Sequence, residues 1–284
     1  MIDIDAPAKI NLALHVCGRR DDGYHLLDSL VVFAGVGDRV SVADADSLTL
    51  ALTGPFAAGL AAEPDNLVLR AARLMMAGAK RGAAITLEKN LPVASGIGGG
   101  STDAAATLIA CAKLWGVDAG ALSRAELATL GADVPVCVAR QPSVMRGIGE
   151  DIAAIEGLPR LWMVLANPGP PLATKAVFGA LRGRFGAPLE PLPPKPGADG
   201  LLAYLERQRN DLTAPAVELM PSIGVVLNAL AATAGCRLAR LSGSGATCFG
   251  LYAEESTARV AAKFLKTAHS GWWVVATPML TDRL

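Results

Sequence analysis

A glycine-rich stretch between a predicted strand and a predicted helix constrains this chain more than any other feature. Four glycines fall within residues 96–100, after a strand expected over Ala84–Lys89 and before an Ala-rich helix expected over Ala104–Trp115. Glycine tolerates positive φ angles, so the backbone of such a loop can lie close to a ligand. Unpaired N–H groups and a partial positive charge at a helix start favour an anion. We therefore predict a phosphate-binding loop over Leu91–Asp103.

Two familiar phosphate motifs are excluded by the residues after the glycines. A P-loop requires a lysine after its last glycine, but Ser101-Thr102-Asp103 follows Gly100 directly. The dinucleotide fingerprint G-x-G-x-x-G fails because Ser101 occupies its sixth position. Either Ser101 or Thr102 is expected to cap the helix, or to turn a hydroxyl toward a phosphate or its metal. The alternative for this segment alone is a flexible hairpin loop followed by a capped helix.

Composition indicates a globular protein without an electrostatic partner surface. The 284 residues favour about two domains of roughly 150 residues each. Its 26 basic and 26 acidic side chains cancel, which argues against a nucleic-acid or anionic-membrane partner. No apolar run approaches the roughly 18 residues of a spanning helix, and residues 1–5 do not resemble a signal peptide. We expect a cytoplasmic protein, either a monomer or a homodimer.

The cysteines and histidines show no metal-binding spacing. Five cysteines are widely separated and form no C-x-x-C pair, so reduced thiols are expected. The three histidines, His15, His25 and His269, form no ligand pattern. We predict no structural zinc and no protein-built metal site.

The first predicted strand, Ala8–Val16, alternates apolar and polar residues. Lys9 and Asn11 therefore lie on the same face, about 7 Å apart. Taken alone, this pattern is more often the solvated face of an antiparallel sheet than a site. A polar turn at residues 19–25 predicts a hairpin to a second strand, Leu26–Ala34.

The rest of the chain predicts strands backed by helices. The turn residues Gly131-Ala132-Asp133-Val134-Pro135 predict a break, with Val134 biased to extended backbone by the proline that follows it. The segment 183–200 is rich in proline and glycine, and it predicts an exposed loop. The remaining expected strands are 38–43, 47–53, 142–155 (short strands), 161–167, 237–241, 247–253 and 272–278. The remaining expected helices are 67–79 (capped by Asp65-Asn66), 123–130, 174–181, 201–209, 212–220, 223–234 and 256–269.

A second glycine turn, Ser242-Gly243-Ser244-Gly245, lies near the end of the chain. Two glycines often mean only a tight turn. Together with the first loop, this turn suggests a second backbone wall for the same anionic ligand.

Three segments in fixed order resemble the motifs of the GHMP family of small-molecule kinases. They are Pro7–Leu12, Pro92–Ala105 and Leu241–Ala246, and the resemblance extends over nearly the whole chain. It implies an α+β fold of two lobes: an N-terminal lobe like domain 2 of ribosomal protein S5, and a ferredoxin-like C-terminal lobe. We expect the first lobe over residues 1–156, binding nucleotide and substrate, and the second over residues 157–284.

The resemblance implies phosphoryl transfer from ATP to an alcohol. Asp133 would accept the hydroxyl proton, and Lys9 would orient Asp133 and offset developing negative charge. Phosphoryl transfer depends on positioning and charge stabilisation, so a weak base suffices. The residues implied to bind ATP are Asn66, Pro92, Val93, Ala94, Ser95, Gly96, Ile97, Gly98, Gly99, Gly100, Ser101 and Thr102.

In detail, the motifs resemble those of a GHMP kinase that acts on an alcohol linked to cytidine diphosphate. It places Tyr24 and Phe178 on the two faces of cytosine, and His25 at its polar edge. Stacking on aromatic rings contributes roughly 1–3 kcal/mol per base. The other residues implied to bind this substrate are Asn11, on its alcohol portion, Thr174, Gly243 and Ser244.

The resemblance also implies Mg²⁺, but no carboxylate stands out as its ligand. We expect the ion to lie mainly on nucleotide phosphates, with a hydroxyl of Ser101 or Thr102. Asp103 would repel a nucleotide unless it caps the helix or contacts metal. The alternatives are a GHMP kinase for a sugar, homoserine or mevalonate, a nucleotide sensor without activity, and a purely structural module.

Overall fold

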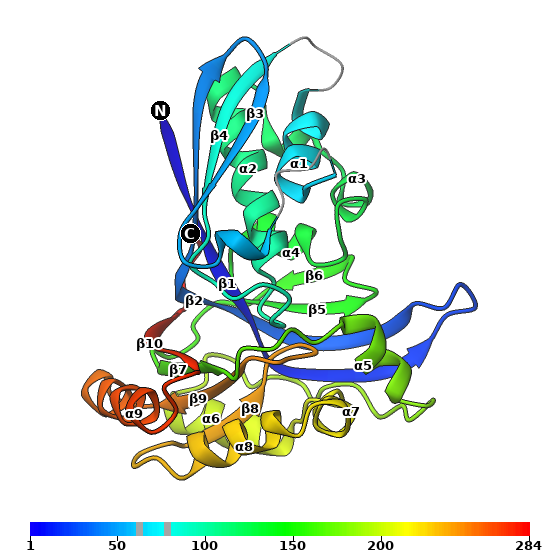
Figure 1. Ribbon diagram of the computed structural model, residues 1–284. Coiled ribbons are helices and arrows are strands. Elements are labelled where there is room, and N and C mark those ends of the chain that lie inside the picture. Colours follow the sequence, from blue (N-terminus) through cyan, green and yellow to red (C-terminus); the bar gives the residue numbers. More distant parts are fainter. Residues whose placement is uncertain (61–64, 77–80) are drawn as a thin grey trace. The chain divides into compact units, whose positions relative to one another are not determined.

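The structure is a computed structural model that describes residues 1–60, 65–76 and 81–284 (Figure 1). Its residue contacts define two compact units, each assembled from separate stretches of the chain. Unit 1 contains Met1–Ala8, Val36–Val93 and Gly98–Arg140, and unit 2 contains Lys9–Gly35, Ala94–Ile97 and Gln141–Leu284. The single boundary expected at residue 156 stays a prediction.

Unit 1 is a small sheet with helices packed on it. Its strands are the second half of β2 (His25–Ala45), β3 (Leu48–Thr53) and β4 (Gly82–Glu88). β4 pairs antiparallel with β2, from Arg39 opposite Glu88 to Ala45 opposite Gly82, and parallel with β3. Its helices are α1 (Leu67–Met76), α2 (Gly99–Trp115), α3 (Arg124–Ala128) and α4 (Val134–Ala139), with 3₁₀ turns η1 (Ala57–Gly59) and η2 (Ala119–Ala121).

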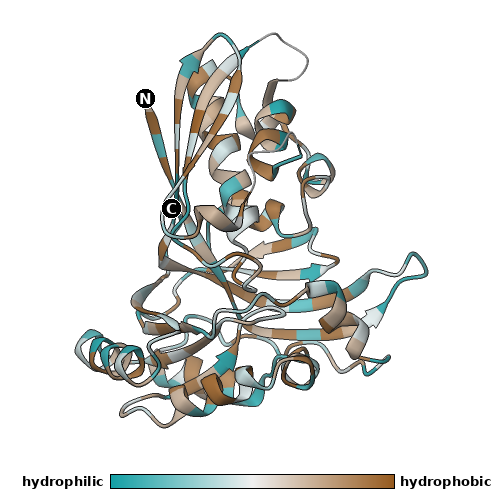
Figure 2. Ribbon diagram, in the orientation of Figure 1, coloured by the Kyte–Doolittle hydropathy of each residue, from teal (hydrophilic) through white to brown (hydrophobic). Residues whose placement is uncertain are grey.

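The core of unit 1 follows from the strand and helix periodicities. Val40 and Val42 of β2 and Ile85 and Leu87 of β4 are buried with the alanines of α2. α2 is largely buried, and its small side chains let α1 and α4 pack closely against it. Figure 2 shows the alternation of apolar and polar residues at the start of β1 (Ile2–Arg19).

Unit 2 begins with a hairpin formed by the rest of β1 and the first half of β2. Arg20 and Tyr24 close the predicted turn through a 2.7 Å hydrogen bond between the Arg20 N–H and the Tyr24 carbonyl. β2 then pairs antiparallel with β5 (Ser143–Gly147), which pairs with β6 (Asp151–Ala154).

The C-terminal part of unit 2 is an antiparallel sheet of β7 (Trp162–Asn167), β8 (Leu238–Leu241), β9 (Cys248–Tyr252) and β10 (Trp273–Leu280). Its order is β10-β7-β9-β8, so these four strands lie in the order 4-1-3-2 of a split βαββαβ unit. The expected ferredoxin-like arrangement is therefore confirmed. The helices of unit 2 are α5 (Thr174–Ala180), α6 (Ala198–Arg207), α7 (Thr213–Leu219), α8 (Ser222–Ala231) and α9 (Glu255–Ala268).

α8 and α9 cover this sheet with their apolar faces (Figure 1). Within the described ranges, every helix is too short or too polar to span a lipid bilayer.

Two local predictions were wrong, and each error has a physical cause. The strands expected at 26–34 and 38–43 are one continuous strand, β2, because its two halves pair with different partners. Val134 is helical and begins α4, with Pro135 in the first turn of that helix. A proline is tolerated there because the backbone N–H that it lacks would have no partner within the helix. The helix expected over 67–79 is confirmed to residue 76, and its last three residues lie outside the described residues.

Candidate functional site

The glycine loop ends in an uncapped helix. α2 begins at Gly99, five residues earlier than expected, and its N-cap residue is Gly98 in the left-handed conformation, with φ 63°. The prediction that Ser101 or Thr102 caps the helix was wrong, because both already lie inside its first turn. The Thr102 hydroxyl donates instead to the Gly99 carbonyl, at 2.9 Å. Among the described residues no side chain caps α2, so its first N–H groups are available to an anion.

The other three glycines of the loop differ in how strictly their surroundings require glycine. A Cβ on Gly96 would lie 2.6 Å from the Gly245 nitrogen, and Gly96 has φ 76°. On Gly99 it would lie 3.1 Å from Lys89 Nζ. On Gly100 its nearest neighbour would be a Leu67 methyl group at 3.8 Å, which is ordinary contact. Gly100, which is exposed, is therefore the glycine that packing least requires.

The two predicted glycine turns contact each other within unit 2. The Ser242 hydroxyl donates to the Gly96 carbonyl at 3.1 Å, and the Thr247 N–H donates to the Ser95 carbonyl at 2.9 Å. A Cβ on Gly243 would lie 2.7 Å from the Gly96 carbonyl oxygen. The glycines at this contact thus permit two backbones to approach closely, whatever ligand either turn binds.

Lys9 and Asn11 lie on a buried face of β1, so the solvated-face alternative was wrong. Lys9 is 3 % exposed and Asn11 is fully buried. The Lys9 ammonium donates to Asn11 Oδ1 at 3.0 Å, and Asn11 Nδ2 donates to the Ser29 hydroxyl at 2.7 Å. The backbone N–H of Lys9 donates to the Ile97 carbonyl of the glycine loop. Asn11 therefore orients the ammonium group of Lys9.

Asp133 precedes α4 directly, in helical backbone conformation and half-buried. It lies in unit 1, in the segment that also contains the N-terminus of α2. Its backbone carbonyl accepts the Cys137 N–H and so holds the first turn of α4.

Two of the residues predicted to bind the base, His25 and Phe178, form an aromatic cluster in unit 2 with Phe185, which the sequence did not suggest. The rings of His25 and Phe178 are tilted against each other, with centroids 4.8 Å apart and an interplanar angle of 32°. Phe185, from the Pro-rich segment, lies edge-on to His25 at 6.1 Å and is 43 % exposed. Tyr24 is also exposed. Burial, helped by the nearby Arg19 charge, lowers the pKa of His25, which favours the neutral ring.

The start of the Pro-rich segment is attached to β1. The Gly186 N–H donates to the Val16 carbonyl at 2.9 Å, and His15 Nδ1 donates to the Ala187 carbonyl at 2.9 Å. His15 Nε2 accepts the Arg209 N–H, so both ring nitrogens are used in the fold. These contacts hold the segment that carries Phe185. The sequence signal for this residue was that Phe185 is the one aromatic residue in segment 183–200.

The remaining predicted substrate residues also lie in unit 2. The hydroxyl groups of Thr174 and Ser244 are 2.9 Å apart, which joins the start of α5 to the second glycine turn. The Asn210 amide donates to the Leu241 and Gly243 carbonyls at 2.8 Å and so fixes the turn. In unit 1, Asn66 Oδ1 accepts the Val68 N–H at the start of α1, as the predicted cap requires.

Sequence reasoning missed the partners of Asp103. Its carboxylate is buried against Lys89, which also pairs with Asp38. The predicted repulsion of a nucleotide by Asp103 is thus offset inside the protein by Lys89.

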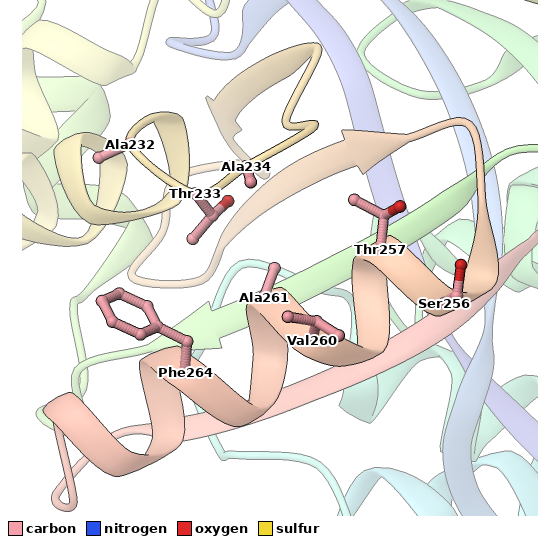
Figure 3. Close-up of a pocket in the computed structure, with 8 residues that line it drawn as sticks. All are labelled: Ala232, Thr233, Ala234, Ser256, Thr257, Val260, Ala261 and Phe264. Carbon is pink, nitrogen blue, oxygen red and sulfur yellow. The ribbon is translucent and has the colours of Figure 1, made fainter.

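Outside these residues, a hollow of about 450 Å³ lies on unit 2, between α9 and the segment after α8 (Figure 3). Figure 3 shows the Val260 and Phe264 side chains of α9 facing the segment that carries Thr233. The described residues that line this hollow carry no charge, and none of them is a predicted site residue. In the described part of the chain, no group of three or more His, Cys, Asp or Glu side chains is arranged to hold a metal ion.

Known proteins match this chain along nearly its full length. Residues 66–156 match the family described as GHMP kinases N terminal domain, and residues 199–270 match GHMP kinases C terminal. A 4-diphosphocytidyl-2-C-methyl-D-erythritol kinase of Cereibacter sphaeroides (strain ATCC 17025 / ATH 2.4.3) is 56% identical, with 96% of this chain and 98% of that protein covered. The enzyme of the same name from Parvibaculum lavamentivorans is 57% identical, with 95% of each chain covered.

Solved structures also superpose on this chain along nearly its full length. A crystal structure of 4-(cytidine 5'-diphospho)-2C-methyl-D-erythritol kinase superposes with a TM-score of 0.81 at 35% identity, covering 99% of this chain and 100% of that one. Homoserine kinase from Cytophaga hutchinsonii superposes with a TM-score of 0.71 at 16% identity, covering 99% and 95%. At that identity the second likeness concerns the fold alone.

Proposed function

Because the chain belongs to the GHMP kinase family, we propose that it transfers the γ-phosphoryl group of ATP to the 2-hydroxyl of 4-diphosphocytidyl-2-C-methyl-D-erythritol. The observation that carries this proposal is identity above 50% to relatives named for this one acceptor, across at least 95% of the chain. The homoserine kinase, named for another acceptor, is only 16% identical. The proposed reaction is a step of non-mevalonate isoprenoid synthesis.

The phosphate chain of ATP is proposed to bind at the start of α2. This is supported by the uncapped N–H groups of the helix and by the exposed backbone at Gly100. The nucleotide set proposed from the sequence, Asn66 and Pro92–Thr102, includes this segment. Glycine at residue 98 is required by its positive φ, and glycine at residue 100 leaves its backbone accessible.

Lys9 and Asp133 are proposed as the catalytic pair. The Asp133 carboxylate would accept the proton of the attacking hydroxyl. The Lys9 ammonium would stabilise the negative charge that develops on the transferred group. The hydrogen bond from Lys9 to Asn11 supports this role, since a lysine held by a buried amide needs no reorganisation when charge develops. The proposed contact of Asn11 with the alcohol portion of the substrate is a further expectation.

The cytosine ring is proposed to bind at the aromatic cluster, between Tyr24 and Phe178. The exposed face of Tyr24 supports stacking. The lowered pKa of His25 supports a neutral ring, which offers one donor and one acceptor to the polar edge of the base. Thr174, Gly243 and Ser244 are proposed to contact the rest of the substrate.

The Mg²⁺ that accompanies the nucleotide fits this chain if phosphate oxygens supply most of its ligands. Mg²⁺ binds few protein carboxylates and keeps several waters. The described residues contain no group of three or more His, Cys, Asp or Glu side chains placed to hold a metal, and Ser101, half-buried in the first turn of α2, offers a hydroxyl. When bound, the ion neutralises phosphate charge.

The proposal also includes the boundaries of the two lobes and the cellular location of the protein. The end of the N-terminal family match at residue 156 supports lobes over 1–156 and 157–284. All five cysteines are free thiols, which supports a reducing compartment such as the cytoplasm.

One assay tests the proposed acceptor. Purified protein is given ATP and, in turn, 4-diphosphocytidyl-2-C-methyl-D-erythritol, 2-C-methyl-D-erythritol 4-phosphate, galactose, homoserine and mevalonate, and ADP formation is measured. We expect turnover with the first compound alone. Equal turnover of the phosphate that lacks the cytidylyl group would refute the base-binding role of the aromatic cluster. Lys9→Ala and Asp133→Asn should each lower kcat at least about 10²-fold with little change in ATP affinity.

A further inference from the structure

Three charged side chains are buried together beneath the glycine loop, in unit 1. The Lys89 ammonium lies 2.5 Å from Asp38 Oδ2 and 2.7 Å from Asp103 Oδ2. All three residues are at most 3 % exposed. We call Asp38, Lys89 and Asp103 the buried charge cluster.

The buried charge cluster joins the two ends of the loop. Asp38 Oδ1 accepts the backbone N–H groups of Asn90, at 2.6 Å, and Leu91, at 2.8 Å, where the loop begins. Asp103 is the fifth residue of α2, where the loop has ended. Lys89 bridges these two carboxylates, so the cluster links the entry of the loop to its exit.

The cluster also contacts the loop directly. A Cβ on Gly99, the first residue of α2, would lie 3.1 Å from Lys89 Nζ and 3.6 Å from Asp38 Oδ2. The ammonium group therefore occupies the space that a side chain at the helix start would take. A shift of Lys89 would move the backbone at the point where the phosphates are proposed to bind.

This arrangement is poorly suited to stabilisation alone. Two carboxylates share one ammonium, and Asp103 Oδ1 is buried without a hydrogen-bond partner among the described residues. Buried ion pairs are often no more stabilising than apolar residues of the same volume, and an unpaired buried oxygen is costly. Burial raises the pKa of the Asp103 carboxyl, and Lys89 opposes this effect in part. The cost indicates a role other than stability.

We propose that Asp103, through Lys89 and Asp38, is a positioning residue that holds the glycine loop in its ATP-binding conformation. The inference rests on the proposed binding of ATP phosphates at this loop. It predicts that the link from Lys89 to residue 103 sets ATP affinity, and that the acceptor oxygen of Asp103, not its charge, makes the link.

The experiment measures ATP binding by calorimetry without an acceptor alcohol, together with KM and kcat. Asp103→Ala removes the link, so the Kd and KM for ATP should rise at least about tenfold. Its kcat and its KM for the alcohol should stay within about threefold. Asp103→Asn keeps an oxygen for Lys89, so it should restore ATP affinity to within about threefold of the wild type. Should Asp103→Ala fail to fold, Asp103→Ser, whose shorter hydroxyl does not reach Lys89, carries the same expectation.

Thr107→Val is the matched control. Thr107 is buried one turn further along α2, and its hydroxyl donates to the Asp103 carbonyl, so its loss destabilises the same helix away from the loop. It should lower the melting temperature and leave ATP affinity unchanged. A purely stabilising role for Asp103 would give Asp103→Ala this same result, and that outcome would overturn the inference. So would a failure of Asp103→Asn to restore ATP affinity.

Gly98→Val separates this inference from the proposed function. A β-branched residue is strained at the positive φ of Gly98, and it would fill space at the start of α2. If Gly98→Val also leaves ATP binding unchanged, the phosphates bind elsewhere and the proposed loop function fails. If Gly98→Val weakens binding while Asp103→Ala does not, the loop function stands and the positioning role of Asp103 fails.

Discussion

The two ends of the glycine loop and its middle are held by opposite physical means. The ends, in unit 1, are held by the buried charge cluster, in which an ammonium group bridges two carboxylates. The middle, Ala94–Ile97 in unit 2, is held by a neutral hydrogen bond from the Ser242 hydroxyl and by close backbone contact with the turn Ser242–Gly245. One loop thus depends on an ammonium bridge between two carboxyl groups at its ends, and on the absence of side chains in its middle.

This difference predicts that the ends and the middle of the glycine loop tolerate different substitutions. At the ends, the critical property is a charge or a hydrogen-bond acceptor, because the partners are buried ions. In the middle, it is volume, because Gly96 and Gly243 bring two backbones closer than any Cβ allows. Substitutions chosen to change charge alone or volume alone therefore separate the two modes of attachment.

The largest effect is expected for Lys89→Met, which removes the charge of the cluster at nearly constant volume. Two buried carboxylates would then lose their cation, at a cost of about 3–5 kcal/mol in the free energy of unfolding. Urea denaturation at pH 7 measures this loss. The double variant Lys89→Met/Asp103→Leu should recover part of it. A Lys89→Met protein as stable as the wild type would show that the cluster is not needed for folding.

The next effect is expected for Gly96→Ala, which adds volume without charge in the middle of the loop. Its Cβ would lie 2.6 Å from the Gly245 nitrogen and the Ser242 oxygen, at a positive φ. Overpacking and left-handed strain together predict a loss of about 2–4 kcal/mol. Gly100→Ala is the matched control, because a Cβ there would meet no atom of the described residues closer than the Leu67 methyl group at 3.8 Å. The two variants should differ clearly in thermal denaturation, and equal stability would contradict the contact.

The pH dependence of stability should reveal Asp103. Burial raises the pKa of its carboxyl, Lys89 partly opposes this, and Asp38 adds to it, so the native pKa exceeds the unfolded one. The unfolded chain then binds fewer protons, and the Asp103 contribution to stability falls as pH rises from the ordinary carboxyl pKa toward the native one. The slope is at most about 1.4 kcal/mol per pH unit. Asp103→Asn should lack this slope in denaturation curves from pH 4 to 8, and parallel curves for the two proteins would contradict the raised pKa.

The smallest effect is expected for Ser242→Ala in the middle of the loop. The Ser242 hydroxyl donates to the carbonyl of Gly96, which is half-buried, and accepts the N–H of Asn11, which is buried. Losing these neutral hydrogen bonds should cost about 1–2 kcal/mol, less than the loss of the cation at the ends. A loss as large as that of Lys89→Met would remove the distinction between charged and neutral attachment.

The sequence by itself determined the features that depend on neighbouring residues. Periodicity and turn chemistry predict the strand before the glycine loop, the hairpin turn at 19–25, the helix cap at Asn66, and the positions of the C-terminal strands along the chain. They do not predict the order of those strands in the sheet. These signals act over a few residues, so they survive without knowledge of the fold. The three motifs in order also indicated the family, because their joint occurrence is specific where each motif alone is not.

Only the tertiary structure decided which polar residues are buried and with whom. The strand containing Lys9 and Asn11 has the pattern of a solvated face, yet both faces are buried. Asp103 gave no sign that it would meet Lys89 and, through it, Asp38, which lies 51 residues before Lys89. Phe185 reached the aromatic cluster through bonds from its loop to β1. Such pairings depend on contacts between distant segments, whose free energy no local pattern encodes.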